Sequence, residues 1–268
     1  MKRISLFAIL AAFLAIGCSD DSNDSSNDTS TTNFLPLQTG NYWVYDIEGS
    51  AVNGRDSLFI SGDTLITGNT YKKLKTENPA FGFYSNALRN NGIRKSGDRL
   101  LLTGAADFGF ASEFPLSINV SDYTIFKENA TAGQQIASVS GTVTQPYDGY
   151  SIVFNYTLSS TAKASEASHT VNGEAYQNIH PVETKLSLNV VAQFTVSGIT
   201  IPYTIMPQQD VVVSTQYYAE NIGAVHVVTN INYQLADLSP LAGAGVELPL
   251  PQSGSDSQEE KLDVYHLE

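Results

Sequence analysis

Residues 42–47 read Tyr-Trp-Val-Tyr-Asp-Ile and follow a Gly-Asn pair at positions 40 and 41. Aromatic and β-branched residues at this density favour a β-strand. Because side chains alternate between the faces of a strand, Trp43, Tyr45 and Ile47 share one face, whereas Tyr42 and Val44 share the other. Both faces are apolar, so we expect both to be covered.

The same kind of short apolar run, separated by turn residues, continues to about residue 237. Ser57–Ile60 and Thr64–Ile66 flank Gly62 and Asp63, which predicts a hairpin with its turn at these two residues. No helical i, i+3, i+4, i+7 pattern lasts for a dozen residues. The sequence therefore predicts an all-β, mostly antiparallel domain over residues 34–237. We expect a curved sheet or half-barrel, with a two-sheet sandwich as the alternative.

Residues 238–268 have a different composition, rich in Gly, Pro and Ser and then acidic. This composition is typical of a loop or linker. Within it, only Lys261–Leu267 has the character of a strand. We therefore predict a C-terminal tail that contains one short edge strand.

The first residues have the features of an export signal. Lys2 and Arg3 precede an apolar run over residues 4–16, which is shorter than the roughly 20 residues that a spanning helix needs. The run ends in Leu-Ala-Ile-Gly-Cys at 14–18, which resembles the lipobox of bacterial lipoproteins. That resemblance implies cleavage between Gly17 and Cys18 and attachment of lipid to the Cys18 thiol. We expect a signal peptide over residues 1–17 and a membrane anchor at Cys18.

Residues 18–33 contain almost no apolar side chains, which predicts a flexible acidic tether. Ser19, Asp20 and Asp21 directly follow the cysteine. This order resembles the export signal of Bacteroidetes surface lipoproteins, in which a serine is followed by acidic residues. The resemblance implies an outer-membrane lipoprotein displayed on the cell surface, with the periplasmic leaflet as the alternative location.

Two further segments resemble one group of proteins. Residues 36–45 match the pattern P-L-x-x-G-N-x-W-x-Y, and residues 217–225 read YYAENIGAV. Both are similar to segments of uncharacterised Bacteroidetes lipoproteins and together bracket most of the predicted domain. The resemblance implies a fold related to LolA- and LolB-like lipoprotein carriers, whose curved antiparallel sheet wraps an apolar cavity. It implies no catalytic residue.

Charge and cysteine content argue against a nucleic-acid-binding protein and against a disulfide-stabilised fold. The formal net charge is −13, which repels nucleic-acid phosphates and anionic headgroups, so we expect no nucleic-acid partner and attachment to the membrane through lipid alone. Cys18 is the only cysteine in the chain, so no intramolecular disulfide is possible. The core must therefore stabilise the fold.

No constellation typical of catalysis or metal binding is present in the sequence. The four histidines are widely spaced, and the zinc motif H-E-x-x-H and the nucleophile motif G-x-S-x-G are absent. His226 has the setting of an ordinary strand histidine. Ser160–Lys163 matches S-x-x-K without that motif's partners, in a stretch that resembles a loop. We expect a non-enzymatic protein with no cofactor and no metal.

Aromatic side chains are the remaining candidates for a binding surface. Trp43, Tyr45, Tyr217 and Tyr218 are candidate ligand-lining residues, although aromatic residues in alternating strands more often form the core. If they are packed solid, the interpretation as a ligand groove fails. The leading hypothesis is a binding module for an apolar ligand, a glycan or a partner protein. The alternatives are a structural or adhesive envelope component and, more remotely, an unrecognised hydrolase.

Overall fold

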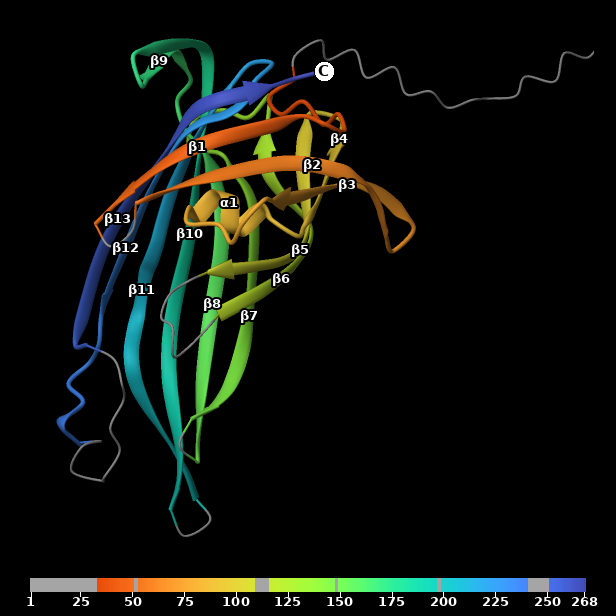
Figure 1. The fold of residues 1–268 in the computed structure, drawn as a ribbon. Coiled ribbons are helices and arrows are strands. Elements are labelled where there is room, and N and C mark those ends of the chain that lie inside the picture. The colour runs from red at the N-terminus through yellow and green to blue at the C-terminus, as the bar shows by residue number, and fades with distance from the viewer. Residues whose placement is uncertain (1–32, 51–52, 109–115, 148, 197–198, 241–250) are drawn as a thin grey trace, which may run out of the picture.

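The computed structural model describes residues 33–50, 53–108, 116–147, 149–196, 199–240 and 251–268. Within them the chain forms one short helix and thirteen strands (Figure 1). The helix is α1 (Phe83–Leu88). The strands are β1 (Tyr42–Gly49), β2 (Gly54–Ile66), β3 (Asn69–Thr76), β4 (Gly92–Ser96), β5 (Arg99–Phe108), β6 (Leu116–Lys127), β7 (Gln135–Tyr147), β8 (Tyr150–Ala162), β9 (Glu166–Val171), β10 (Glu174–Val196), β11 (Ile199–Ala219), β12 (Gly223–Gln234) and β13 (Ser253–His266).

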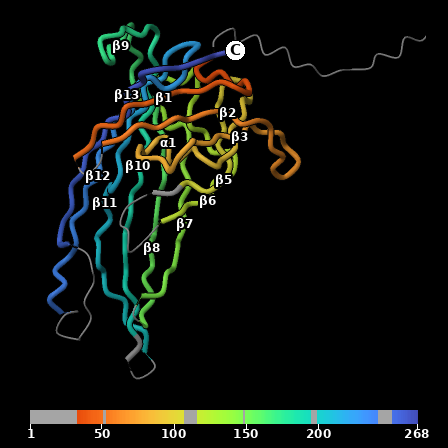
Figure 2. The backbone as a smooth tube through the Cα atoms, viewed as in Figure 1, coloured from red at the N-terminus to blue at the C-terminus, as the bar shows by residue number. Residues whose placement is uncertain are grey.

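All strands belong to one antiparallel sheet in the order β6-β5-β4-β3-β2-β1-β13-β12-β11-β10-β8-β7, and β9 pairs with the start of β10. The sheet curls until its two end strands, β6 and β7, pack against each other, although no ladder joins them among the described residues (Figures 1 and 2). This nearly closed, barrel-shaped sheet confirms the predicted all-β class and curved-sheet architecture. The alternative of two packed sheets does not apply.

The faces of β1 follow the predicted alternation. Trp43, Tyr45 and Ile47 are at most 2 % exposed and belong to a single hydrophobic core that draws on almost every strand. Tyr42 and Val44, on the opposite face, are only half-buried. The prediction is therefore confirmed for the inner face. The outer face is less covered because no second sheet lies over it.

The predicted short edge strand near the C-terminus is wrong. β13 is 14 residues long and lies inside the sheet, paired with β1 on one side and β12 on the other. Leu262 and Glu260 point into the core and are about 1 % exposed. The strand was missed because its first half is Ser, Gly and acidic residues, and ladders on both sides stabilise it in place of local apolar alternation. The β domain therefore extends beyond residue 237.

The predicted turn at Gly62 and Asp63 is also wrong. β2 runs continuously through both residues, and the register against β3 shifts between Ile60 and Gly62. Gly62 has a φ of +140°, a conformation that glycine adopts readily, and this explains how the strand accommodates the bulge. The chain reverses instead at Thr67 and Gly68, which both have positive φ.

Helix α1 was not predicted because six residues are too few to show a helical period. In the part of the chain that the structure describes, no helix combines the length and apolar character needed to cross a bilayer.

Candidate functional site

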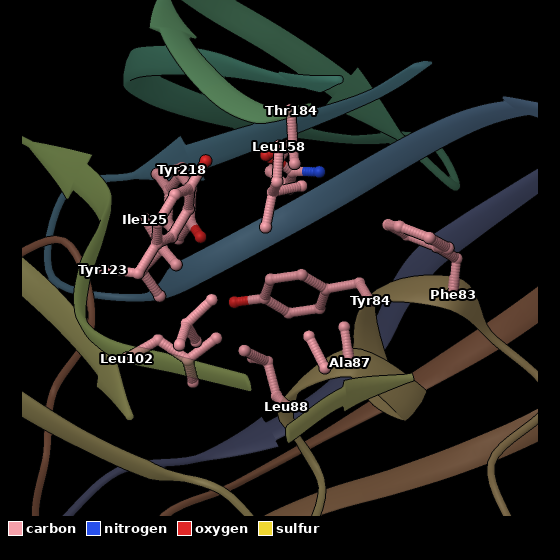
Figure 3. A pocket seen from close by; sticks show the side chains of 13 residues that line it. Phe83, Tyr84, Ala87, Leu88, Leu102, Tyr123, Ile125, Leu158, Thr184 and Tyr218 are labelled. Atoms are coloured by element: carbon pink, nitrogen blue, oxygen red, sulfur yellow. The ribbon is translucent and has the colours of Figure 1, made fainter. Parts of the chain in front are cut away.

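Helix α1 closes one side of a space inside the curved sheet. It packs against β3, β5 and β13, and it faces β6, β8, β10 and β11 across a cavity (Figures 1 and 3). An isolated helix of this length is unstable in water, so its surroundings must satisfy its backbone. The contacts at its two ends explain how it is held.

Three side chains from the sheet accept the free backbone N–H groups at the start of α1. Asp56 on β2 accepts from Phe81 and Gly82, at 2.7 Å for the Gly82 N–H. Gln258 Oε1 on β13 accepts from Phe83 at 2.8 Å. The carboxylate of Glu260 accepts from the Tyr84 N–H at 2.5 Å and from the Ser85 N–H and hydroxyl.

Glu260 has an unusual environment for a carboxyl group. It is 1 % exposed, and burial raises its pKa from 4.5 to about 7; the hydrogen bonds from Tyr84 and Ser85 partly oppose this shift, and the nearby charge of Asp56 adds to it. Gly82 leaves the necessary space, because a Cβ there would lie 2.1 Å from Glu260 Oε2. The Glu260 carboxyl group therefore satisfies backbone N–H groups at the start of α1, and the close approach of Gly82 helps to bury that carboxyl group.

Asn91 ties the other end of α1 to β5. Its Nδ2 donates to the carbonyls of Ala87 and Ala105, both at 2.8 Å, and its Oδ1 accepts from the Ala105 N–H. Gly104, with a φ of +145°, makes room for this side chain, since a Cβ there would lie 2.0 Å from Asn91 Oδ1. Both ends of the helix are thus held by polar side chains that the sheet or its flanking turns supply.

The cavity itself is apolar and has about 50 Å³ of free space. Among the described residues that line it, none carries a charge. The apolar part of the lining comes from α1, β5, β6 and β8 and includes Phe83, Leu88, Leu102, Ile125 and Leu158 (Figure 3). Cavities with such linings stay dry and take up apolar molecules. The free space suits a few heavy atoms, so a larger ligand must displace side chains of α1.

One wall of the cavity carries a row of polar side chains that bond to one another. Thr184 and Gln216 line the cavity, and the Thr184 hydroxyl donates to Gln216 Oε1 at 3.2 Å. Further bonds extend the row in both directions. Its members, across five strands, are Tyr123, Ser160, Thr184, Gln216, Ser214 and Thr229. Because these groups satisfy each other, the row is compatible with a buried wall.

Tyr84 is the exception among the polar groups of the cavity. Its hydroxyl is buried and has no hydrogen-bond partner in the part of the chain that the structure describes. The ring is 4 % exposed and extends from α1 across the cavity, with the hydroxyl directed toward the side lined by Leu102 and Tyr218 (Figure 3). Burial raises the pKa of Tyr84 well above 10, and the charges of Tyr218 and Tyr45 and a contact with the Tyr218 hydroxyl raise it further, so the hydroxyl keeps its proton. That contact lacks the geometry of a hydrogen bond.

Of the four predicted ligand-lining residues, only Tyr218 lines this cavity. Trp43 and Tyr45 are packed solid, and their polar atoms donate to the carbonyls of Ile222 and Ala224 at 2.7 and 2.8 Å. They are core residues of this fold, so the predicted ligand groove lined by Trp43 and Tyr45 is wrong, and the cavity lies elsewhere, beside α1. The α1 residues that do line the cavity carried no signal in the sequence.

Tyr217 points away from the cavity into a cluster that the sequence did not reveal. Its ring stacks on His169 with centroids 4.2 Å apart. His169 Nε2 lies 3.0 Å from His226 Nδ1, and the outer nitrogens of the two rings contact Glu166 and Glu259. Burial lowers the pKa of His226. His226 is therefore the satisfied strand histidine that was predicted, and the cluster joins β9 to β12.

The residues that the sequence offered as candidates for catalysis or metal binding do not lie together in the structure. Ser160 lies within β8 and not in a loop, and its hydroxyl bonds to Tyr123, whereas Lys163 pairs with Glu183 at 3.2 Å. Among the described residues, no three His, Cys, Asp or Glu side chains are placed to hold a metal ion.

Gly17, Cys18, Ser19, Asp20 and Asp21, predicted as the cleavage site, lipid anchor and export signal, lie outside the described residues. Comparison with protein-family models, curated proteins and solved structures finds no match to this chain.

Proposed function

We propose that this chain is a lipoprotein anchored through Cys18, whose β domain is a non-enzymatic binding module for an apolar ligand. The observation that carries the binding function is the uncharged cavity between α1 and the sheet. The lipobox-like residues 14–18 support the anchor, and residues 19–21 support display on the cell surface. The periplasmic leaflet is the alternative location.

Helix α1 supports this proposal as the movable wall of the cavity. A six-residue helix held by side-chain contacts at its ends has little local stability of its own. A shift of α1 would enlarge the cavity without breaking a ladder of the sheet, although it would break hydrogen bonds to Asp56, Gln258 and Glu260. The helix therefore provides a route by which a ligand larger than the present free space enters.

Filling the cavity tests the binding function. Ala87 lines the cavity from α1 and is only partly buried, so Ala87→Phe places an aromatic ring there. We expect wild-type protein purified from its native envelope to release an apolar compound on organic extraction, measured by mass spectrometry. The Ala87→Phe protein is expected to release at least about tenfold less, which corresponds to about 1.4 kcal/mol of binding free energy.

Ala167→Phe is the matched control, because Ala167 is exposed on β9, far from this lining. This variant is expected to carry as much compound as the wild type. Equal loading of the Ala87→Phe and wild-type proteins, or an empty wild-type protein, contradicts the proposal.

Cys18→Ser tests the anchor. Without the thiol no diacylglycerol can attach, and the acidic protein surface offers no attraction to anionic lipid. We expect the variant to move from the membrane fraction to the soluble fraction, measured by immunoblotting. A variant that stays with the membrane would show that another element anchors the protein. Protease treatment of intact cells then separates surface display, in which the domain is cut, from the periplasmic leaflet.

A second candidate function is an adhesive or structural role without a small ligand. Residues 186–209, which include the end of β10 and the start of β11, contain no charged side chain. Ile199 and Ile201 in this region are 67 % and 50 % exposed. Exposed aliphatic side chains in an uncharged segment favour contact with another apolar surface. Replacing both with serine would weaken cell attachment under this function and leave the extracted compound unchanged.

A further inference from the structure

The strongest unexplained feature of the cavity is the Tyr84 hydroxyl. A buried polar group without a partner costs about 1–3 kcal/mol, and native proteins contain few of them. Two other tyrosine hydroxyl groups nearby are paired: Tyr123 bonds to Ser160 at 2.9 Å, and Tyr45 bonds to the Ala224 carbonyl. The Tyr84 hydroxyl adjoins that of Tyr218 but makes no hydrogen bond of normal geometry within the described part of the cavity.

The position of Tyr84 indicates the role of its hydroxyl group. The ring extends from α1, and the hydroxyl is directed across the cavity toward the side lined by Leu102 and Tyr218 (Figure 3). A phenylalanine at this position would line the cavity equally well and avoid the cost of the unpaired group. A ligand with an oxygen acceptor would supply the missing partner.

We propose that Tyr84 is the hydrogen-bonding anchor of the ligand, and that the ligand is an uncharged aliphatic molecule with one oxygen acceptor, such as a ketone, an ester or an alcohol. This inference rests on the proposed binding function and specifies the class of ligand. The ligand is uncharged because no charged side chain lines the cavity in the part of the chain that the structure describes, and burying an unpaired charge is costly. It is an acceptor because the protonated tyrosine hydroxyl donates.

A pair of matched probes tests this assignment. Heptane and heptan-2-one have the same number of carbons and differ by one carbonyl oxygen. The protein chain from residue 18, with Cys18→Ser, keeps every residue of the hydrophobic core. Methyl NMR titration of this chain gives the dissociation constant of each probe. Shifts of the Leu88, Leu102 and Leu158 methyl groups identify binding in the cavity.

We expect heptan-2-one to bind more tightly than heptane to the otherwise wild-type chain. Tyr84→Phe is expected to reduce this preference about tenfold, because it weakens the binding of heptan-2-one and leaves the binding of heptane unchanged. Tyr265→Phe is the control, since Tyr265 lies on β13, is 37 % exposed and does not line the cavity. It is expected to leave the preference unchanged.

The outcomes separate the two proposals. If neither probe shifts the cavity methyl groups, the binding function itself fails. If both probes bind but Tyr84→Phe keeps the full preference for heptan-2-one, the function stands and the anchor is wrong. The thermal unfolding midpoint gives a second readout: Tyr84→Phe should keep or raise it. A fall in the midpoint would show that the hydroxyl already has a stabilising partner, and would overturn the assignment.

Discussion

Trp43→Ala is expected to lower the free energy of unfolding by about 4 kcal/mol, measured by urea denaturation. Trp43 is fully buried in the middle of the sheet, and its indole Nε1 donates to the Ile222 carbonyl at 2.7 Å. The indole ring also packs against Gly223, where an added Cβ would lie 3.1 Å from Trp43 Nε1. The alanine would leave a cavity and an unsatisfied carbonyl together.

Two further variants separate these contributions. Trp43→Phe keeps a ring but loses the donor, and we expect about 2 kcal/mol of destabilisation. Tyr265→Ala removes an aromatic side chain that is 37 % exposed on β13, with an expected loss of less than about 1 kcal/mol. Equal losses for Trp43→Ala and Tyr265→Ala would contradict the assignment of Trp43 to the core.

The second large effect is the pH dependence caused by Glu260. Burial raises its pKa from 4.5 to about 7, so the folded protein retains a proton that the unfolded chain has lost between these values. The contribution of Glu260 to stability is therefore greatest at acidic pH and declines as the pH rises from 4.5 to 7, by about 3 kcal/mol in total. Above pH 7 this contribution is constant.

Glu260→Gln isolates this effect because glutamine fills the same space without titrating. We expect the difference in unfolding free energy between wild type and Glu260→Gln to change by about 3 kcal/mol between pH 4.5 and 8, in favour of the variant at high pH. Taking the difference cancels other groups, including His226, whose lowered pKa acts in the opposite direction. Asp237→Asn, at an exposed carboxyl group whose pKa is lowered from 3.8 by hydrogen bonds from Ser239, should retain the wild-type slope in this range. Parallel curves for wild type and Glu260→Gln would contradict the assignment.

The site was harder to predict than the fold. Tyr218 was among the predicted lining residues, but Tyr84 and Leu88 were not, because α1 is too short to show a period. Glu260 was one acidic residue among 27 Asp and Glu residues in the sequence. Only burial beneath the start of α1 distinguishes it, and burial there depends on how β13 and β2 are brought together.

The sequence by itself determined the all-β class and the inner face of β1, because alternation is a local property that each strand carries in its own residues. Only the tertiary structure decided that β13 is an inner strand, that Trp43 is core, and that the cavity lies under α1. Each of these depends on ladders and contacts between residues far apart in the chain, such as β1 with β13. Local patterns do not encode such pairings, so the cavity and the unpaired hydroxyl of Tyr84 arise only when the sheet closes.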